Sequence, residues 1–292
     1  MKKRTKIIAS LGPSSSSGMK LEKMMHAGAD VFRINLSHTK IEDAKKVIDL
    51  VRSTEKKVGR PVAVMLDLQG QKIRIKGFSK KTYITLRNGD DFVINPELDN
   101  NGNQKQVGIT YKDLYKNVKE GDELLLSDAL IKLRVKKVQS KKIYTVVERG
   151  GKLKPHQGLN KKGGGLSLSG ITAKDKSDLK KSLSYEYDYI AVSFVKDDKD
   201  VLAIKNIIKH KDIKVIAKIE RNEALKNIDK ITKAADGLLV ARGDLGVEIG
   251  IEQLPAAQRF LIRKAISFDK LAIVATQMME SMITNRVPTR AE

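Results

Sequence analysis

The chain has 292 residues, 40% of them hydrophobic, which suits one large or two smaller folded domains and excludes disordered and fibrous proteins. It contains no cysteine, so disulfides, thiolate metal sites and a cysteine nucleophile are excluded. The formal net charge of +22 raises the question of nucleic-acid binding. However, the lysines and arginines are spread along the chain, aromatic residues make up 4%, and no zinc-finger or RNP-like pattern occurs, so solvated basic surfaces are favoured instead.

The first residues, MKKRTKIIAS, are basic, but the apolar stretch that follows is much shorter than the roughly 7 to 15 residues of a signal-peptide core. No run approaches the roughly 18 apolar residues of a membrane helix. The sequence therefore predicts a cytoplasmic protein without a membrane partner.

Short apolar runs alternate with helical periods along much of the chain. The helical period after the second run predicts a helix that ends at Gly59 and buries Ile41, Ala44, Val47, Ile48 and Val51. Near-continuous apolar strands separated by helices indicate a parallel sheet covered on its outside. The predicted strands span residues 5–10, 30–37, 61–68, 189–195, 213–220, 236–243 and 271–277.

A region with a different pattern interrupts this alternation. From residue 69 to 167 the chain has short β-prone segments, at 81–95, 122–138 and 141–153, joined by turn signals such as NG and RGG. This pattern predicts an all-β domain, residues 69–167, inserted after the third strand of a discontinuous domain made of residues 1–68 and 168–292.

The discontinuous domain predicts an α/β fold of the (β/α)8 TIM-barrel type that is incomplete at the C-terminus. It offers seven strands, and it is shorter than the roughly 250 residues of a complete barrel. The last residues, NRVPTRAE, carry no terminal turn or tail, so we expect a gene fragment cut within a domain.

Polar residues stand where the predicted strands end. The carboxyl ends of barrel strands form one rim, which is where barrel active sites lie. Six strand ends that converge on one rim are more informative than any single motif. The rim residues are Arg33, Asn35, Ser37, His38, Asp67, Ser193, Lys218, Glu220, Arg242, Asp244, Thr276 and Gln277.

Glu220 and Asp244 end neighbouring strands, so two carboxylates can face one divalent cation, although carboxylates also commonly cap helices at such turns. Lys218 lies on the same strand face as Glu220. For a lysine inside a barrel mouth, a functional role is favoured over a purely structural ion pair. Arg33 and Lys218 could hold a phosphoryl group together, with backbone amides of GDLG adding an anion site. KKGGGLS, at 161–167, is compatible with either a phosphate loop or a hinge.

These residues, in this order, resemble the pyruvate kinase family. The motifs that carry the resemblance are TKIIASLGPSS, FRINLSH, DLQGQKIR, VIAKIERNEAL, GLLVARGDLGVEI and VATQMMESMITNRVPTRAE. They cover the chain from end to end, and the β insert matches the lid domain of that family. The resemblance implies a glycolytic kinase that transfers the phosphoryl group of phosphoenolpyruvate to ADP, giving pyruvate and ATP.

The resemblance also implies roles for individual residues. Glu220 and Asp244 would bind Mg²⁺ or Mn²⁺, and Lys218, Arg33 and Thr276 would be catalytic. Closure of the lid would exclude water. Substrate contacts would come from Arg33, Ser193, Lys218, Gly243, Asp244 and Thr276, and nucleotide contacts from Asn35, His38 and Arg74.

A monovalent-cation site in the family corresponds to Asn35, Ser37, Asp67 and the carbonyl of Leu68. Potassium-requiring members typically carry a glutamate where this sequence has Lys72, whose ammonium would replace the ion, so the resemblance implies that K⁺ is not required. Two residues depart from the family pattern. Gln157 replaces a lysine common in relatives and weakens a nucleotide contact, and Gln71 replaces the usual proline at the lid hinge.

Family members continue past PTRAE into a last barrel unit and a C-terminal domain with subunit contacts. The full-length protein is therefore expected to be a homo-oligomer, and the 292-residue chain alone is expected to have little or no activity. Two other readings stay open: another metal-dependent barrel enzyme acting on phosphoenolpyruvate or pyruvate, such as a lyase, and a basic nucleic-acid-binding fragment.

Overall fold

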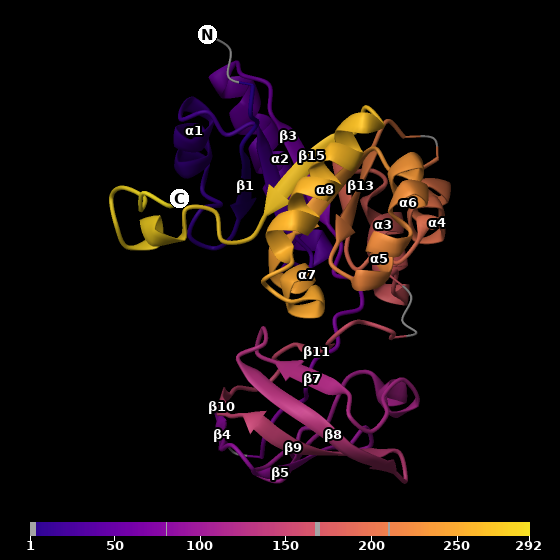
Figure 1. The fold of residues 1–292 in the computed structure, drawn as a ribbon. Coiled ribbons are helices and arrows are strands. Elements are labelled where there is room, and N and C mark those ends of the chain that lie inside the picture. Colours follow the sequence, from indigo (N-terminus) through magenta and orange to yellow (C-terminus); the bar gives the residue numbers. More distant parts are fainter. Residues whose placement is uncertain (1–3, 80, 167–169, 210) are drawn as a thin grey trace.

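The computed structural model describes residues 4–79, 81–166, 170–209 and 211–292 (Figure 1). Its largest sheet has seven parallel strands in the order β1-β2-β3-β12-β13-β14-β15, and each predicted strand overlaps one of them. The strands are β1 (Ile8–Leu11), β2 (Val31–Asn35), β3 (Ala63–Asp67), β12 (Tyr189–Val192), β13 (Lys214–Ile219), β14 (Gly237–Ala241) and β15 (Leu271–Ala275).

Helices cover the outer side of this sheet (Figure 1). They are α1 (Gly18–His26), α2 (Ile41–Val58), α3 (Ala173–Ser182), α4 (Asp198–Ile208), α5 (Asn222–Lys226), α6 (Ile228–Ala234), α7 (Arg242–Ile249) and α8 (Leu254–Ser267). Helix α2 confirms the predicted periodicity, because four of the five predicted residues are buried and Val47 is half-buried against the same core. Gly59 ends the helix with a φ of 69°, a left-handed conformation that glycine adopts without a Cβ clash.

The parallel sheet curls but does not close among the described residues. Strands β1 and β15 lie at its two ends, and each pairs with one neighbouring strand. The concave face holds a small apolar cluster around Met65, Ile216 and Leu239, which are buried, whereas Ile273 near the β15 end is half-buried. The fold is therefore α/β, and the sheet is that of an incomplete TIM barrel, as predicted.

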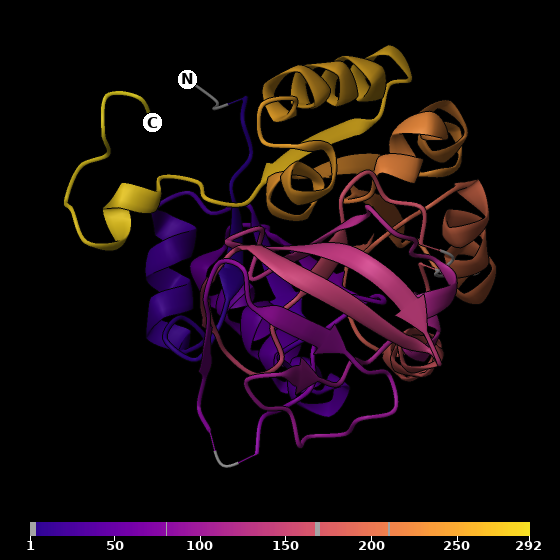
Figure 2. The ribbon, with the colours of Figure 1, turned by 60° about the horizontal axis from the view of Figure 1, so that its bottom comes forward.

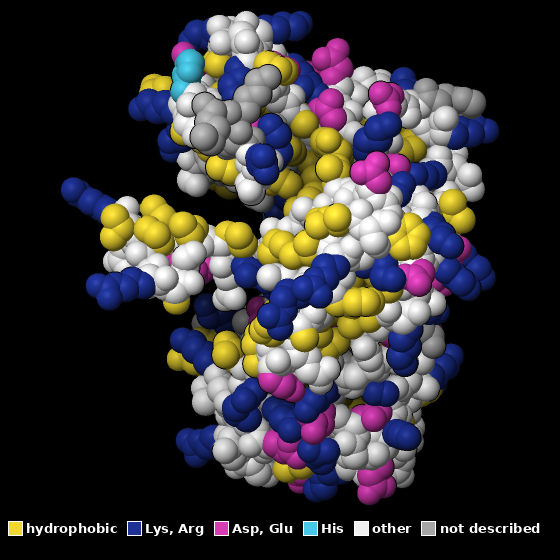
Figure 3. Space-filling view, turned by 45° about the horizontal axis from the view of Figure 1, so that its top comes forward, with side chains coloured by type: hydrophobic (Ala, Val, Ile, Leu, Met, Phe, Trp, Pro, Cys, Tyr) yellow, Lys and Arg dark blue, Asp and Glu magenta, His cyan; other side chains and the backbone are white. Residues whose placement is uncertain are grey.

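The segment after β15 projects from the body of the molecule (Figure 1). It contains one 3-10 helix, η2 (Glu280–Ile283), and exposes Met282, Ile283 and Val287. In Figure 3 hydrophobic side chains line this projection and continue onto the body, whereas Lys and Arg are dispersed over the face with Asp and Glu between them. This dispersion agrees with the prediction of solvated basic surfaces.

Between β3 and β12 the chain forms two antiparallel-rich sheets, with strand orders β11-β7-β8-β9-β5-β6 and β10-β4, together with one 3-10 helix. These residues have a hydrophobic core of their own, which runs from Ile73 to Leu166. The elements are β4 (Ile84–Leu86), β5 (Asp91–Ile94), β6 (Gln106–Val107), η1 (Lys112–Lys116), β7 (Glu123–Leu126), β8 (Ile131–Gln139), β9 (Lys142–Arg149), β10 (Gly151–Leu153) and β11 (Leu159–Lys161).

This β-rich part lies at the end of the parallel sheet from which β3 leaves, and Figure 2 shows it in front of that sheet. The chain passes from one part to the other through residues 68–73 and returns after β11, and an ion pair between Lys72 and Asp244 also links the two parts. The domain boundary predicted between residues 167 and 168 lies outside the described residues. The β-rich part therefore overhangs the rim on which the polar residues were predicted to converge.

Candidate active site

Most of the predicted site residues line one cavity of about 210 Å³ at the carboxyl ends of the parallel strands. Strands β2 and β13 contribute to it directly, and the segments after β2, β3, β12, β13 and β14 supply the rest. The cavity is lined by Arg33, Asn35, Ser37, His38, Gln69, Lys72, Arg74, Ser193, Phe194, Lys218, Glu220 and Asp244. The predicted convergence of polar groups at this rim is thus found in the structure.

A second cavity, of about 420 Å³, occupies the concave face of the sheet. It shares Arg33, Lys218, Glu220 and Asp244 with the first cavity and adds Thr276, which follows β15. Thr276 has a φ of 76°, in the left-handed region, and its Cγ2 would lie 3.1 Å from a Cβ placed on Gly243. Glycine at position 243 therefore permits the close approach of α7 to this threonine.

Lys218 is the most enclosed cation of the site, with 11% of its side chain exposed. Its Nζ lies 2.7 Å from Ser193 Oγ, 3.1 Å from Glu220 Oε1 and 3.2 Å from Asp67 Oδ1. Burial lowers the pKa of Lys218, but the negative charges of Glu220 and Asp67 outweigh it and raise the pKa above its usual value. The ammonium is therefore kept charged inside the protein.

Arg33 faces Lys218 across a shared carboxylate. Its Nε donates to Asp67 Oδ2 at 2.7 Å, its Nη2 forms an ion pair with the same oxygen, and its Nη1 donates to Ser10 Oγ at 2.8 Å. Asp67, at the end of β3, has 1% of its side chain exposed. One buried carboxylate thus holds both predicted phosphoryl-binding cations in place, and Ser193 also donates to it at 3.3 Å.

The two predicted metal ligands occupy different environments. Glu220, which follows β13, is buried, and its Oε2 accepts a hydrogen bond from the Phe194 amide at 2.6 Å. Burial raises the pKa of Glu220, Lys218 opposes this, and the negative charge of Asp244 adds to the increase. Asp244 lies in the first turn of α7 rather than on β14, and 21% of its side chain is exposed.

The chemistry of these two groups fits a hard divalent cation. A buried carboxylate such as Glu220, with a second carboxylate beside it, gains most from a positive charge placed between the two. Among residues 4–79, 81–166, 170–209 and 211–292, no group of three or more His, Asp or Glu side chains is arranged to hold a metal ion. Two protein carboxylates, with other ligands drawn from water or substrate, are typical of magnesium bound with phosphates.

Lys72 lies beside this carboxylate pair. Its Nζ is 2.7 Å from Asp244 Oδ1 and 3.9 Å from Asp128 Oδ1, which belongs to the turn after β7. The lysine is reached through a connection that passes close to the barrel at Gly70, where φ is 64° and an added Cβ would be 2.7 Å from Ser193 Cβ. The side chain therefore places a positive charge at the site and bridges the two parts of the chain.

The residues predicted for a monovalent cation lie together on the β2 and β3 side. Asn35 Oδ1 accepts from the Ser37 amide at 2.9 Å, and the Leu68 carbonyl accepts from Ser193 Oγ at 2.7 Å. Both oxygens of Asp67 contact cationic side chains of the protein itself. The position is thus already supplied with positive charge from Arg33 and Lys218.

Other predicted residues lie at the margins of the cavity. Arg74 reaches it from the β-rich part, where its Nη1 donates to the His156 carbonyl at 2.9 Å. Gln157 does not line this cavity; its Oε1 contacts Ser127 Oγ and the Lys154 amide instead. Arg242 turns away, because its Nε donates to the Ala275 carbonyl at 3.0 Å and it ties the segment after β15 to α7.

Several site residues were not predicted from the sequence. Ser10 ends a predicted strand, so its place on the rim could have been recognised in the same way as that of Asp67. The Phe194 amide, which binds Glu220, could not, because a backbone group leaves no residue-type signal; its φ of 55° turns the amide toward the carboxylate. Gln69 lies within DLQGQKIR, where the motif drew attention to Lys72 instead.

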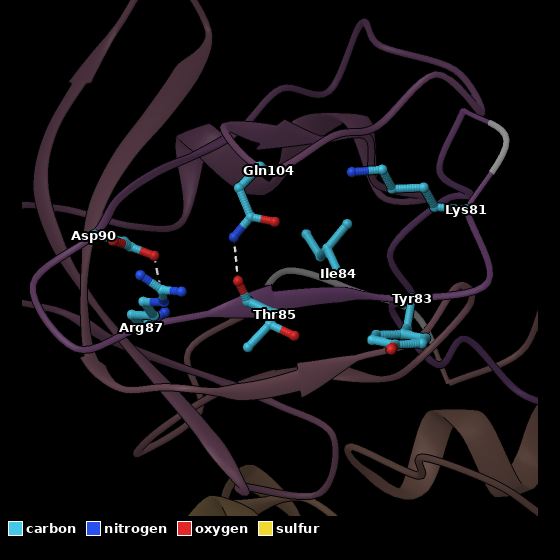
Figure 4. Close-up of a pocket in the computed structure, with 7 residues that line it drawn as sticks. All are labelled: Lys81, Tyr83, Ile84, Thr85, Arg87, Asp90 and Gln104. Atoms are coloured by element: carbon cyan, nitrogen blue, oxygen red, sulfur yellow. Dashed lines mark hydrogen bonds between the residues drawn. The ribbon is translucent and has the colours of Figure 1, made fainter.

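One larger cavity, of about 570 Å³, lies apart from these residues on the β-rich part and is lined by Lys81, Tyr83, Ile84, Thr85, Arg87, Asp90 and Gln104 (Figure 4). Gln104 reaches across it to the Thr85 carbonyl, and Asp90 accepts from the Arg87 amide. None of the predicted site residues faces this cavity. The smaller cavity therefore remains the candidate active site, although its volume is lower.

No helix among the described residues is both long and apolar enough to cross a membrane.

The chain is similar to known proteins along nearly its whole length. A sequence profile described as the pyruvate kinase barrel domain matches residues 2–292. Pyruvate kinase II of Salmonella typhimurium is 45% identical over 296 residues, which cover 99% of this chain and 62% of that protein.

Two further relatives give the same picture. The pyruvate kinase of Haemophilus influenzae is 43% identical over 296 residues, with 99% of this chain and 62% of the relative covered. That of Thermococcus litoralis is 43% identical over 291 residues, with 99% and 61% covered. The chain thus spans about three fifths of the length of these relatives. Since the profile extends over nearly every residue, and the site gathers the residues that the resemblance singled out, the chain belongs to the pyruvate kinase family.

Proposed function

We propose that the protein transfers the phosphoryl group of phosphoenolpyruvate to ADP, giving pyruvate and ATP in glycolysis. Family membership supports this proposal. The observation that carries it is the meeting of two cations, Arg33 and Lys218, with two carboxylates, Glu220 and Asp244, in one cavity at the carboxyl ends of the parallel strands. A phosphoryl group needs positive charge around its oxygens, and the carboxylate pair suits a divalent cation.

In this reaction the bond between phosphorus and the enol oxygen breaks, and a bond to a terminal oxygen of ADP forms. The methylene carbon of the resulting enolate then takes a proton. Lys218 and Arg33 would hold the equatorial oxygens during transfer. Because Asp67 fixes both cations beforehand, they need little rearrangement in the transition state, which is the main source of catalysis for phosphoryl transfer.

Glu220 and Asp244 would hold Mg²⁺ or Mn²⁺. The bound ion would neutralise charge on the phosphoryl group and the enolate oxygen. The residues around this pair have separate tasks. The Phe194 amide orients Glu220, and the Lys218 ammonium opposes the increase in pKa that burial causes at that carboxyl.

The remaining predicted residues complete the proposed site. Ser193, Gly243 and Thr276 would contact the substrate, with Thr276 beside the face on which the enolate is protonated. Asn35, His38 and Arg74 would face the nucleotide phosphates. Residues 69–167 would act as a lid, and closure over the cavity would exclude water, which limits hydrolysis of the phosphoryl group.

We further propose that the enzyme does not require K⁺. The Lys72 ammonium lies 2.7 Å from Asp244, so a fixed positive charge is present at the site where the resemblance places a glutamate in potassium-requiring members. A side chain attached to the protein supplies this charge without a bound monovalent ion. Homo-oligomeric assembly and a cytoplasmic location are proposed on the family alone, to be tested by light scattering and cell fractionation.

The first test concerns phosphoryl transfer itself. Pyruvate formation, coupled to lactate dehydrogenase, would be followed for the 292-residue chain and for the product of its complete reading frame. The complete product should form pyruvate only with ADP present, and Lys218→Met should lower kcat by about 10³-fold or more because the cation nearest the transferred group is lost. Lys214→Met is the matched control, since Lys214 lies on the same strand but is exposed.

Pyruvate formation without ADP would indicate a lyase or phosphatase instead. Unchanged turnover in Lys218→Met would refute the assignment of the phosphoryl site. The 292-residue chain alone is expected to be far less active than the complete product, since its sheet is open between β1 and β15.

The second test concerns the monovalent ion. In buffer free of Na⁺ and K⁺ the complete product should be fully active, and Lys72→Glu should be at least about tenfold stimulated by KCl because a carboxylate then stands beside Asp244. Lys105→Glu, an equal change of charge at an exposed position of the β-rich part, should show no such stimulation. Strong activation of the parent enzyme by KCl would contradict the proposal.

A further inference from the structure

The two connections between the β-rich part and the barrel pass over a common point. They enclose a cavity of about 20 Å³, which has room for a single water molecule. Its walls come from both connections and from the barrel turns after β12, β13 and β14. The lining residues are Gln71, Lys72, Ile73, Leu159, Asn160, Leu166, Phe194, Arg221 and Glu248. Glu248 is the carboxylate in this set, and the mechanism proposed above gives it no task.

Glu248 lies in α7, one turn after Asp244, and is 4% exposed. Its Oε2 accepts a hydrogen bond from the Asn222 amide at 2.8 Å, and its carbonyl accepts one from the Gly163 amide at 2.9 Å. Asn222 closes the ring, because its Nδ2 donates to the Gly163 carbonyl at 3.0 Å. Gly163 of the returning connection is thus held on both sides by barrel residues.

A second pair of residues continues this attachment along the connection. Arg221, with 4% of its side chain exposed, donates through Nη2 to the Leu166 carbonyl at 2.6 Å. Glu223 Oε1 accepts from the Gly165 amide at 2.6 Å and lies 3.2 Å from Arg221 Nη2. We call Arg221, Asn222, Glu223 and Glu248 the anchor, and the residues that they hold, 163–166, the strap.

The anchor residues are chain neighbours of the proposed metal ligands. Arg221 and Asn222 directly follow Glu220, and Glu248 follows Asp244 at a spacing of four in the same helix, on the same helical face. The hydrogen bond from Asn222 to Glu248 therefore links the turn that carries Glu220 to the helix that carries Asp244. A displacement of the strap would change the relative position of these two carboxylates.

Glu248 contributes to this link through an oxygen atom rather than through its charge. Burial raises its pKa to about 7; the hydrogen bond from Asn222 opposes the shift, and the nearby charge of Glu223 adds to it. A carboxyl that is readily neutral near pH 7 can still accept the hydrogen bond from Asn222. A glutamine could do the same, whereas an alanine could not.

We propose that Glu248 is a positioning residue that couples the strap to the spacing of Glu220 and Asp244. The orientation of the lid and the affinity of the metal site then depend on each other. This inference rests on the proposed function, because it takes the two carboxylates as the metal site. It assigns Glu248 no contact with substrate or metal. Its effect is transmitted through the Asn222 amide and the first turns of α5 and α7.

The test uses the 292-residue chain and Mn²⁺ alone, titrated by electron paramagnetic resonance, together with hydrogen exchange of residues 163–166 and Asn222. Glu248→Ala should weaken Mn²⁺ binding about tenfold, as is typical when a residue that orients metal ligands is removed. It should also speed exchange at Asn222 and Gly163. Glu248→Gln should bind Mn²⁺ within about twofold of the parent and keep the slow exchange.

Glu252→Ala is the matched control, because Glu252 is exposed and four residues further along, and it should match the parent in both measurements. If Glu248→Ala fails to fold, Glu248→Asp replaces it, since its shorter side chain keeps the charge but withdraws the acceptor from Asn222. Equal Mn²⁺ affinity in the parent and in Glu248→Ala or Glu248→Asp would overturn the coupling, and so would a loss as large in Glu252→Ala. A parent chain that binds no Mn²⁺ would refute the metal site proposed above, and the coupling with it.

Discussion

Two groups of four charged side chains, each with two cations and two carboxylates, lie in different parts of the molecule. At the rim of the barrel, Arg33 and Lys218 contact the carboxylates of Asp67 and Glu220. On the β-rich part, Lys132 and Arg134 contact Glu123 and Glu148 at distances of 2.9–3.3 Å, apart from one closer contact between Arg134 and Glu148. Each group has two cations, two carboxylates and several ion pairs, so a count of salt bridges does not distinguish them.

Their surroundings do distinguish them. The carboxylates Asp67 and Glu220 have 1% and 3% of their side chains exposed, whereas the carboxylates Glu123 and Glu148 have 18% and 31%. The surface group joins residues on three neighbouring antiparallel strands, and water screens its charges. The buried group joins residues from separate parallel strands in a place where removing one partner leaves an uncompensated charge. Burial, and not pairing, marks the group that we propose to act on a substrate.

The largest effect that this comparison predicts is on folding. Asp67→Asn removes the buried carboxylate shared by Lys218 and Arg33, and the free energy of unfolding should fall by about 3 kcal/mol or more. Urea denaturation measures this change. Asp91→Asn is the control, since Asp91 pairs with Lys136 on the surface and should cost less than about 1 kcal/mol. Equal losses for the two variants would remove the distinction between the groups.

A smaller effect concerns Glu248, a buried carboxyl whose counter-charge is incomplete. Its pKa of about 7 in the folded protein exceeds the usual 4.5, so the native state binds the proton more tightly than the unfolded state does. Its contribution to stability is therefore fully present below pH 4.5 and is lost as the pH rises to 7, by up to roughly 3 kcal/mol.

Glu248→Gln removes the titrating carboxyl group, so the free energy of unfolding of the variant should not show the loss between pH 4.5 and 7 that is expected of the parent. Urea denaturation of the parent and the variant at pH 5, 6 and 7 gives the comparison. A difference between the two that does not change with pH would mean that Glu248 is ionised throughout, as Glu123 is expected to be. Lys132 and Arg134 lower the pKa of Glu123 to about 2 against the opposing effect of burial.

The smallest effect is expected in the surface group. Glu148→Gln should lower the free energy of unfolding by about 0.5 kcal/mol, and the loss should shrink further in 1 M salt, where the Debye length is about 3 Å. Thermal denaturation at 0.05 and 1 M NaCl measures both quantities. A loss above about 2 kcal/mol that persists in high salt would place this group with the buried one.

Local patterns predicted the fold well. All seven parallel strands, helix α2 with its end at Gly59, and the β-rich insert follow from apolar periodicity and turn residues, which depend on near neighbours in the chain. The start of α7 was predicted less well: Arg242 and Gly243 were placed in the strand predicted at 236–243, yet the helix begins at Arg242. No residue before it has a side chain that caps the helix, so the sequence held no start signal.

The site was predictable as a set of residues but not as a set of contacts. Rim position follows from strand ends, so Lys218, Glu220 and Asp67 could be grouped without coordinates. The pairing of Lys72 with Asp244, 172 residues apart, depends on how the insert is carried over the rim. The same holds for Glu248, which reads in the sequence as an ordinary helical residue, and whose burial arises from the connection that lies across it.

The open sheet described above has a consequence for how copies of this chain behave toward one another. The free sides of β1 and β15 each present a row of backbone donors and acceptors that a strand of another copy could pair with. A net charge of +22 opposes such encounters by mutual repulsion. Because that repulsion is screened over about 10 Å at 0.1 M salt, the chain should be monodisperse in dilute buffer and should self-associate as ionic strength rises. Added salt would thus promote association of this chain, whereas it keeps some other proteins dispersed.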